Sequence, residues 1–242
     1  MILRRVIEHV KAQNWTAVAL DFVIVVVGVF IGIQVSNWND GRRVEALEQS
    51  YLTRLADDLN DNIARFNAEI EFSSASRDHL TGFLEALKDP ATSDADLVRH
   101  TINYLNDGVF YSKLQTTETT FNDLQSTGNL DTIRDKKLRE ALVELHARYA
   151  RSQESVQITL DWALPADSQF YMQVDAFRFD QKTAAFFSQK SIAETAQYIR
   201  TKQDILTRHA ALHFWLKDRA LELLQDANDQ TKTVRDQIEG SL

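Results

Sequence analysis

Cysteine is absent from this chain of 242 residues, and proline and glycine are scarce. The lack of cysteine excludes disulfide bonds, thiolate catalysis and every metal site that needs a cysteine ligand. Two prolines and seven glycines are few breaks for this length, which favours long helices. The sequence also has no glycine-rich phosphate loop, no dinucleotide fingerprint and no glycine-flanked serine elbow. The common signatures of nucleotide-binding enzymes and serine hydrolases are therefore missing.

Positive charge is also in short supply, because 27 lysines and arginines face 35 aspartates and glutamates. The formal net charge is −8, and the acidic excess lies downstream of residue 40. An acidic domain repels nucleic acid and anionic lipid headgroups, so we expect no nucleic-acid partner. About 200 residues follow the first 43, which is enough for one domain with a substantial core.

The strongest signal in the chain is an apolar run between two tryptophans, Trp15 and Trp38. No polar side chain occurs from Phe22 to Ile33. As a helix, the segment between the tryptophans is about 35 Å long. That length crosses a hydrocarbon core of about 30 Å and puts both indoles at headgroup depth as interface anchors. The run is longer than a signal-peptide core and lacks a small-residue cleavage site, so we predict an uncleaved transmembrane helix over 15–38.

This helix divides the chain into an amphipathic tail (1–14), the transmembrane helix and a helical-bundle domain (44–242). Lysines and arginines are nearly balanced on the two sides of the span, so charge alone does not fix the orientation. A long downstream domain crosses a membrane largely regardless of its charge. We therefore expect a cytoplasmic tail and a domain on the opposite side, which in a bacterial inner membrane is the periplasm.

Apolar residues at helical spacing predict an all-α fold, in which the transmembrane helix continues into an antiparallel bundle of long helices. The first long helix follows a possible hinge at Gly41 and stops at Pro90. Its solvent face is predicted to carry Asp57, Asp58, Asn60, Asp61 and Asn62. A second long helix runs from about Asp131 to Leu164, and Pro165 breaks or restarts it.

The third long helix is predicted from Ser191 to about Glu239, because this stretch has no glycine or proline. Its apolar side is lined by Ile192, Ile199, Leu206, His213, Leu216, Ala220, Leu223 and Ala227. Shorter elements are predicted between the long helices. After the first long helix come a helix that is capped by Ser93 and ends near Gly108, a non-helical stretch over 109–116, and a short helix that starts at Thr117 and ends near Gly128. After the second comes an aromatic block at 166–188, which forms a shorter helix and a loop.

Two stretches carry a resemblance to a known family. They are LDFVIVVVGVFIGIQVSNWND at residues 20–40 and TTFNDLQSTGNLDTIRDKKLREALVELHARY at residues 119–149. Both resemble an uncharacterised bacterial family of single-pass membrane proteins that is known as a domain of unknown function. The resemblance implies an inner-membrane anchor and a helical domain. It implies no activity, substrate or catalytic residue.

Four residues of the span are candidates for packing against another membrane helix. Gly28 and Gly32 form a GxxxG pair, which lets two helices approach closely, although glycine is common in membrane helices without this role. Gln34 can hydrogen-bond across such an interface. A charged carboxylate such as that of Asp21 is energetically costly inside a membrane. Its presence has three explanations: a shallow hydrated position, a contact with another membrane subunit or a proton relay.

His209 and His213 lie one helical turn apart and are the weak candidates for a metal site. Their motif, HAALH, lacks the glutamate of the metalloprotease motif, and the sequence identifies no third ligand. We therefore expect buried or half-buried core histidines, because His213 falls on the apolar side of its helix, and a metal site is the alternative. We predict no cofactor and no catalytic residues.

These features predict a membrane-anchored interaction or accessory protein without enzymatic activity. Its expected partners are the lipid bilayer and either a second copy or another membrane subunit. The alternative is a sensor domain that binds a small ligand in the bundle, lined by the aromatic block, and signals through a partner.

Overall fold

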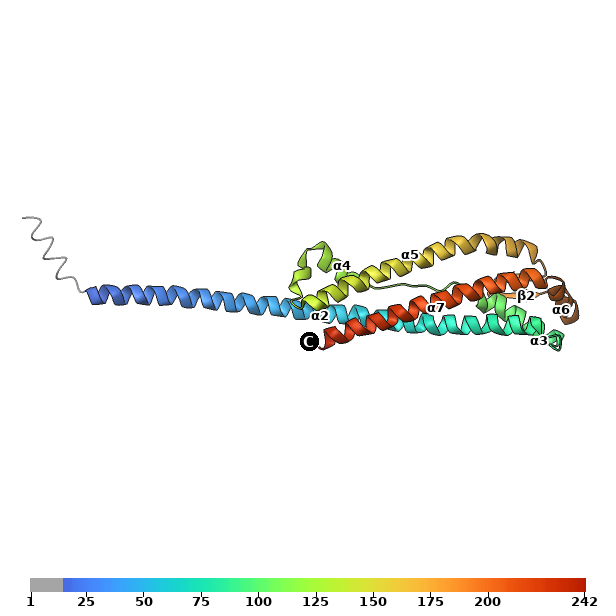
Figure 1. Ribbon diagram of the computed structural model, residues 1–242, viewed down its shortest axis with the longest axis horizontal. Helices are drawn as coiled ribbons and strands as arrows, with labels where there is room; N and C mark the ends of the chain where they lie inside the picture. The colour runs from blue at the N-terminus through green and yellow to red at the C-terminus, as the bar shows by residue number, and fades with distance from the viewer. Residues whose placement is uncertain (1–14) are drawn as a thin grey trace, which may run out of the picture. The chain divides into compact units, whose positions relative to one another are not determined.

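The computed structural model describes residues 15–242, apart from the side chains of residues 15–18 and 21. The predicted tail therefore lies outside the described residues. The chain divides into two units, Met1–Ser50 and Tyr51–Leu242. The described residues are mostly helical, so the predicted all-α class is confirmed (Figure 1). Helix α2, Trp15–Lys88, continues without a break through Gly41, the position of the possible hinge.

Within the second unit, α2 has one apolar face, and the helix ends two residues before Pro90. Its buried residues include Leu52, Leu55, Leu59, Phe66, Leu80 and Phe83. The predicted solvent face is wrong at Asn62, whose side chain is fully buried. The reason is that a non-helical segment packs on this face and needs polar partners for its backbone.

The short elements that follow α2 agree closely with the predictions. They are α3 (Asp94–Asn103), the π-helix η1 (Tyr104–Gly108), α4 (Thr119–Ser126) and the 3₁₀-helix η2 (Asn129–Thr132). Ser93 caps α3 by accepting a hydrogen bond from the backbone N–H of Asp96. Residues 109–118, which we call the crossover segment, are not helical. Gly128 follows α4 with a φ of 71°, a conformation that favours glycine.

Helix α5, Lys136–Gln173, continues through Pro165, so the predicted break there is wrong. A proline inside a helix costs about 3 kcal/mol, because it removes a backbone hydrogen bond. Buried Ala163 and Phe170 pack on either side of the proline and hold the helix in place. Proline also bends a helix, and α5 is bowed in its second half, which contains Pro165 (Figure 1).

The aromatic block contains a hairpin that the sequence did not predict, made of β1 (Phe177–Asp180) and β2 (Ala185–Ser188). The predicted final helix is two helices, α6 (Ile192–Thr201) and α7 (Gln203–Glu239), with a break at Lys202. Because α6 is a separate helix, Ile192 leaves the predicted apolar stripe and is 55% exposed.

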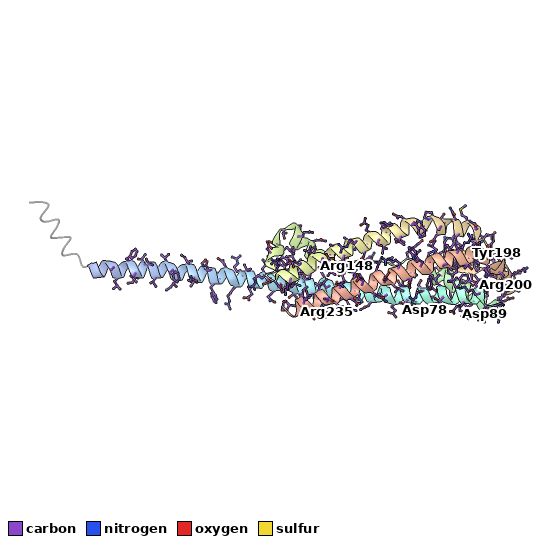
Figure 2. The ribbon with its side chains drawn as sticks, in the orientation of Figure 1. Asp78, Asp89, Arg148, Tyr198, Arg200 and Arg235 are labelled. Atoms are coloured by element: carbon purple, nitrogen blue, oxygen red, sulfur yellow. The ribbon has the colours of Figure 1, made fainter. Side chains whose placement is uncertain are left out.

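The three long helices of the second unit do not all alternate in direction. Helix α7 runs antiparallel to α2 and to α5, whereas α2 and α5 run the same way because the crossover segment returns the chain between them (Figure 1). Arg148 of α5 pairs with Asp226 of α7 at 2.9 Å, and Arg235 of α7 donates to Asn60 of α2 at 2.9 Å. Figure 2 labels the two arginines on their helices. These contacts join α7 to both of the other long helices.

The core consists of two apolar clusters. The first joins the early part of α2 to α4, the start of α5 and the end of α7, around Phe66 and Tyr149. The second joins the end of α2 to α3, η1, the hairpin, α6 and the start of α7, around Phe83 and Tyr104. Between Phe66 and Leu80, the buried residues of α2 are serines, Ser73 and Ser76, so polar groups occupy the interior there.

Candidate functional site

The apolar segment of α2 is fully exposed within its unit. Among the residues that the structure describes, one helix is long and apolar enough to cross a membrane, and none of its apolar window is buried. Phe22 is 69% exposed and Phe30 is 60% exposed. Exposed apolar surface on this scale is typical of segments that contact lipid or another protein.

The two glycines of the GxxxG pair lie on an open helix surface. A β-carbon added to Gly28 or to Gly32 meets no atom within 4 Å. The pair is one helical turn apart, so both glycines fall on one face. This face is available for the close approach of a second helix.

The other predicted membrane-helix residues are partly described. Gln34 is exposed, and Trp38 is 62% exposed, with the Arg42 guanidinium 4.6 Å above its ring. An arginine stacked on a tryptophan suits the boundary between lipid and water. The side chains of Trp15 and Asp21 lie outside the described residues.

A second candidate site is a cluster of buried polar side chains that joins α5 to α7. Asp167 Oδ1 lies 3.0 Å from His209 Nε2 and 2.9 Å from His213 Nε2. The Tyr111 hydroxyl, from the crossover segment, donates to the other carboxylate oxygen, Oδ2, at 2.6 Å. The histidine side chains are 4% and 1% exposed, and that of Asp167 is 14% exposed. We call these three residues, Asp167, His209 and His213, the Asp-His-His cluster.

The rings around the cluster hold its members in place. Tyr104 of η1 is fully buried and its hydroxyl hydrogen-bonds to His209 Nδ1, the nitrogen that faces away from Asp167. Phe170 stacks on the His209 ring with centroids 3.6 Å apart. His209 therefore has a fixed ring orientation.

The surroundings set the charges of the cluster. Burial raises the pKa of Asp167, but hydrogen bonds from His209, His213 and Tyr111 outweigh this effect and hold the pKa well below its usual value. Burial lowers the pKa of His209, against the opposing effect of Asp167. Asp167 is thus a carboxylate and His209 a neutral imidazole at neutral pH.

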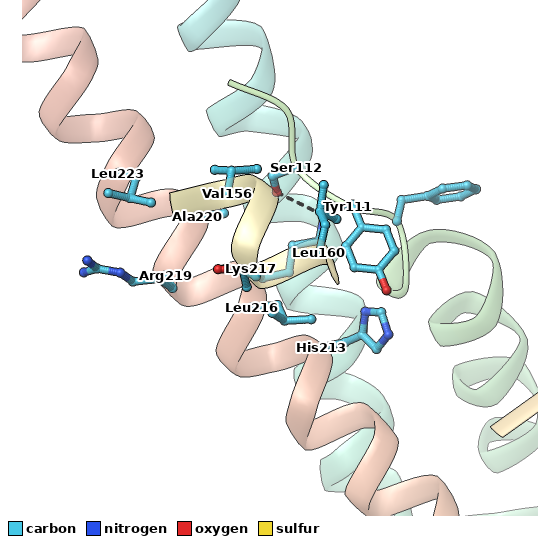
Figure 3. Close-up of a pocket in the computed structure, with 12 residues that line it drawn as sticks. Tyr111, Ser112, Val156, Leu160, His213, Leu216, Lys217, Arg219, Ala220 and Leu223 are labelled. Atoms are coloured by element: carbon cyan, nitrogen blue, oxygen red, sulfur yellow. Dashed lines mark hydrogen bonds between the residues drawn. The ribbon is translucent and has the colours of Figure 1, made fainter. Parts of the chain in front are cut away.

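Lys217, one turn beyond His213 on α7, is an unusual buried lysine. It is 2% exposed, and its Nζ donates to Ser112 Oγ at 3.2 Å and lies 5.0 Å from the Phe72 ring centroid. Burial lowers the pKa of Lys217 to about 8, although Glu69 opposes the shift. Lys217, His213 and other residues line a cavity of about 30 Å³ (Figure 3).

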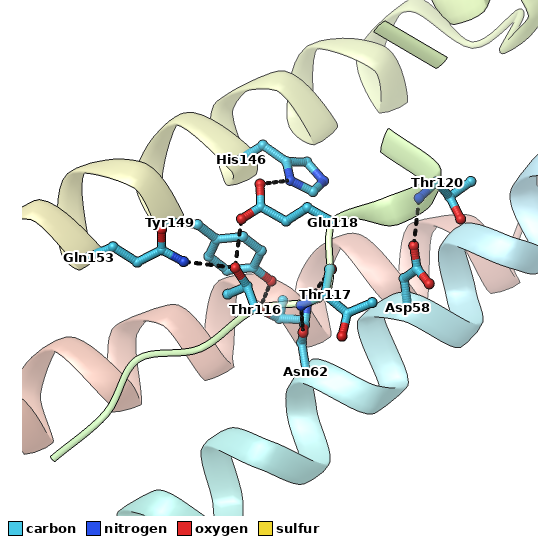
Figure 4. Close-up of polar contacts among 10 residues, drawn as sticks. Asp58, Asn62, Thr116, Thr117, Glu118, Thr120, His146, Tyr149 and Gln153 are labelled. Carbon is cyan, nitrogen blue, oxygen red and sulfur yellow. Dashed lines mark hydrogen bonds and ion pairs between the residues drawn. The ribbon is translucent and has the colours of Figure 1, made fainter. Parts of the chain in front are cut away.

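A separate polar network attaches the crossover segment to the long helices (Figure 4). Asn62 of α2 pairs with the backbone of Thr117 through two hydrogen bonds of 2.9 Å and 2.6 Å. Asp58 of α2 accepts a hydrogen bond from Thr120 N at 2.8 Å, near the start of α4. Glu118 pairs with buried His146 of α5 at 2.8 Å, and this hydrogen bond lowers the pKa of Glu118. Each group serves a neighbouring backbone or side chain, so we interpret the network as structural.

The sequence located His209 and His213 but missed the residue that joins them. The expectation that they are buried is confirmed, and the structure adds a third polar member, Asp167, from a different helix. Asp167 is 42 residues from His209 and follows Pro165, where a break in the helix was expected. The available signal was an acidic residue at the start of the aromatic block.

Residues 21–155 match a protein family described as a family of unknown function (DUF6090). The chain belongs to this family. The match covers more than half of the 242 residues, including α2 from Asp21 onward and the network around Asn62 and Glu118. The Asp-His-His cluster lies downstream of the part matched to DUF6090. No curated protein and no solved structure matches the chain.

Proposed function

We propose that this chain is a single-pass protein of the bacterial inner membrane, with a helical domain that serves as an interaction or accessory subunit of a membrane complex. The supporting observation is the exposed apolar face of α2 from Phe22 to Ile33. Moving ten large apolar side chains from water into lipid stabilises the inserted state by on the order of 20 kcal/mol. The proposed role is physical and requires no catalytic step.

In this proposal the tail lies in the cytoplasm and the helical domain in the periplasm. Since the chain has no cysteine, a single introduced cysteine reports topology without background. We expect Thr183→Cys, in the exposed hairpin loop, to react with a membrane-impermeant maleimide in spheroplasts. Glu8→Cys should react only after lysis. The reverse pattern would invert the proposed orientation.

Membrane anchoring is tested by fractionation. The intact protein should stay with membranes after carbonate washing and ultracentrifugation, because carbonate removes peripheral proteins only. Replacing Val26 and Phe30 with lysine should release the protein or prevent its insertion, since each charge at the bilayer centre costs about 3 kcal/mol. A wild-type protein that appears in the supernatant would refute the anchor.

The partner helix is proposed to dock on the Gly28–Gly32 face, as a second copy or as another membrane subunit. Replacing both glycines with isoleucine should abolish crosslinking within the membrane, because the β-branched side chains hold the helices apart. Replacing Val23 and Val27 with isoleucine is the matched control, since this pair has the same spacing on the opposite face. Equal crosslinking by both double variants would exclude this interface.

A second candidate function is the binding of a small ligand, and one observation favours it. A cavity of about 220 Å³ is lined by aromatic residues of the predicted block, including Phe170, Tyr171 and Phe186, together with Arg178. These groups suit a small aromatic anion. Aromatic carboxylates should then raise the melting temperature of the intact protein in detergent, and Arg178→Gln should remove the effect. A screen with no shift would dismiss this function.

A further inference from the structure

The geometry points to a metal site in the helical domain, at which Asp167, His209 and His213 bind one divalent transition-metal ion of the zinc class. The proposal is independent of membrane anchoring and goes beyond an accessory role. It starts from the convergence of a carboxylate from α5 with two imidazoles from α7, whose ligand atoms all lie within 4.8 Å of one another.

The donor set and its spacing suit such an ion. Two imidazole nitrogens and one carboxylate oxygen are typical ligands of zinc and of neighbouring transition metals, whereas calcium and magnesium prefer oxygen ligands. A tetrahedral zinc ion with bonds of about 2.0–2.1 Å separates neighbouring ligand atoms by about 3.3 Å. Oδ1 of Asp167 is 3.0 Å and 2.9 Å from the two Nε2 atoms, and all three ligand atoms lie within 4.8 Å of one another, so small side-chain movements bring them to the spacing that the ion needs.

The neighbouring contacts resemble the outer shell of known metal sites, in which the second nitrogen of a histidine ligand is hydrogen-bonded. When Nε2 of His209 binds the ion, the imidazole proton lies on Nδ1 and is donated to the Tyr104 hydroxyl oxygen. Tyr111 holds Oδ2 of Asp167 and leaves Oδ1 directed at the histidines. Two of the three ligands are thus oriented by buried or half-buried tyrosines.

The site also has an approach and room for a further ligand. A groove of about 320 Å³ reaches His209 and is lined by Gln169, Gln173 and Arg208. On the other side, the cavity of about 30 Å³ beside Tyr111 and His213 has room for one water molecule. Three protein ligands and one water form the usual arrangement of an open zinc site. The ion would also link α5 to α7.

The direct test is metal binding by the intact protein in detergent, purified through an affinity tag without histidine and stripped with a chelator. Titration with Co²⁺ should produce visible absorption bands of tetrahedral intensity that saturate at one ion per chain. Zn²⁺ should then displace Co²⁺ and raise the melting temperature by several degrees. Elemental analysis of the unstripped protein should find about one zinc-class ion per chain.

Variants identify the ligands. We expect Asp167→Asn and His213→Gln each to weaken Co²⁺ binding by at least about 100-fold, and Tyr104→Phe to weaken it by about 10-fold through loss of the outer contact. The matched controls are His79→Gln and His100→Gln, which remove histidines outside the cluster and should leave the affinity unchanged.

Two results would overturn the proposal, and the first of them requires no variant. The first is a wild-type titration without saturable binding below about 10 μM, which would leave the cluster as a hydrogen-bonded core. The second is binding that the His79→Gln or His100→Gln control removes, which would place the ion elsewhere. Failure of the membrane fractionation test would leave this inference unaffected.

Discussion

The buried ammonium group of Lys217 makes a quantitative prediction about stability. Its pKa of about 8 in the folded protein compares with an ordinary value of 10.5. Below pH 8 the lysine is charged in both the folded and the unfolded state, and the folded state carries the full cost of burying the charge. The difference between the two pKa values corresponds to about 3 kcal/mol.

The sign of the pH dependence follows from proton binding. Between pH 8 and 10.5 the unfolded chain keeps a proton on Lys217 that the folded protein has lost. The free energy of unfolding therefore rises with pH through this range, as far as Lys217 is concerned. Replacing Lys217 with methionine removes this contribution and keeps a side chain of similar length.

The measurement is urea unfolding of the protein in detergent, followed by far-ultraviolet circular dichroism at pH 7 and pH 10.5. The stability of Lys217→Met relative to wild type should be about 3 kcal/mol greater at pH 7 than at pH 10.5. Comparing two pH values cancels the packing contribution of the methionine. Exposed Lys137→Met is the control and should show no such change. An equal difference at both pH values would refute the desolvation of Lys217.

Three further substitutions test the local structure. Gly128→Ala should cost about 1 kcal/mol because its φ of 71° disfavours a β-carbon, whereas Gly240→Ala should be nearly neutral. Ser191→Ala removes the capping box of α6 and should cost about 1 kcal/mol by urea unfolding. Glu118→Gln should cost about 1 kcal/mol at pH 7, and the cost should shrink as pH falls below about 4.5, because the lowered pKa of Glu118 contributes stability only while the group is ionised. A pH-independent cost for Glu118→Gln would contradict the ionic role of this residue.

The sequence was most informative where local chemistry decides structure. Ser93 caps α3, Gly128 follows α4 in a left-handed conformation, and α2 ends just before Pro90. In each case the residue type favours one backbone conformation at its own position and at the adjacent residues. The all-α class followed for the same reason, since apolar spacing and few breaks act over short distances.

The sequence failed where packing between distant segments decides structure. Proline at 165 stays inside α5 because buried residues on both sides hold the helix, and local propensity does not report that support. Asn62 was assigned to solvent because its partner, the backbone of Thr117, is 55 residues away. Asp167 was missed because its contact with the histidines exists only after α5 and α7 pack together.

The pairing of α7 with α2 has a consequence for biosynthesis. Asn228 bonds to Asn67 across 161 residues, and Arg235 bonds to Asn60 across 175. The ribosome releases α2 long before it releases α7, the last helix that packs on it. Part of the apolar face of α2 therefore stays exposed to solvent until α7 emerges. Contacts that close such long loops form slowly. The nascent chain therefore presents a chaperone with a long interval in which to bind it.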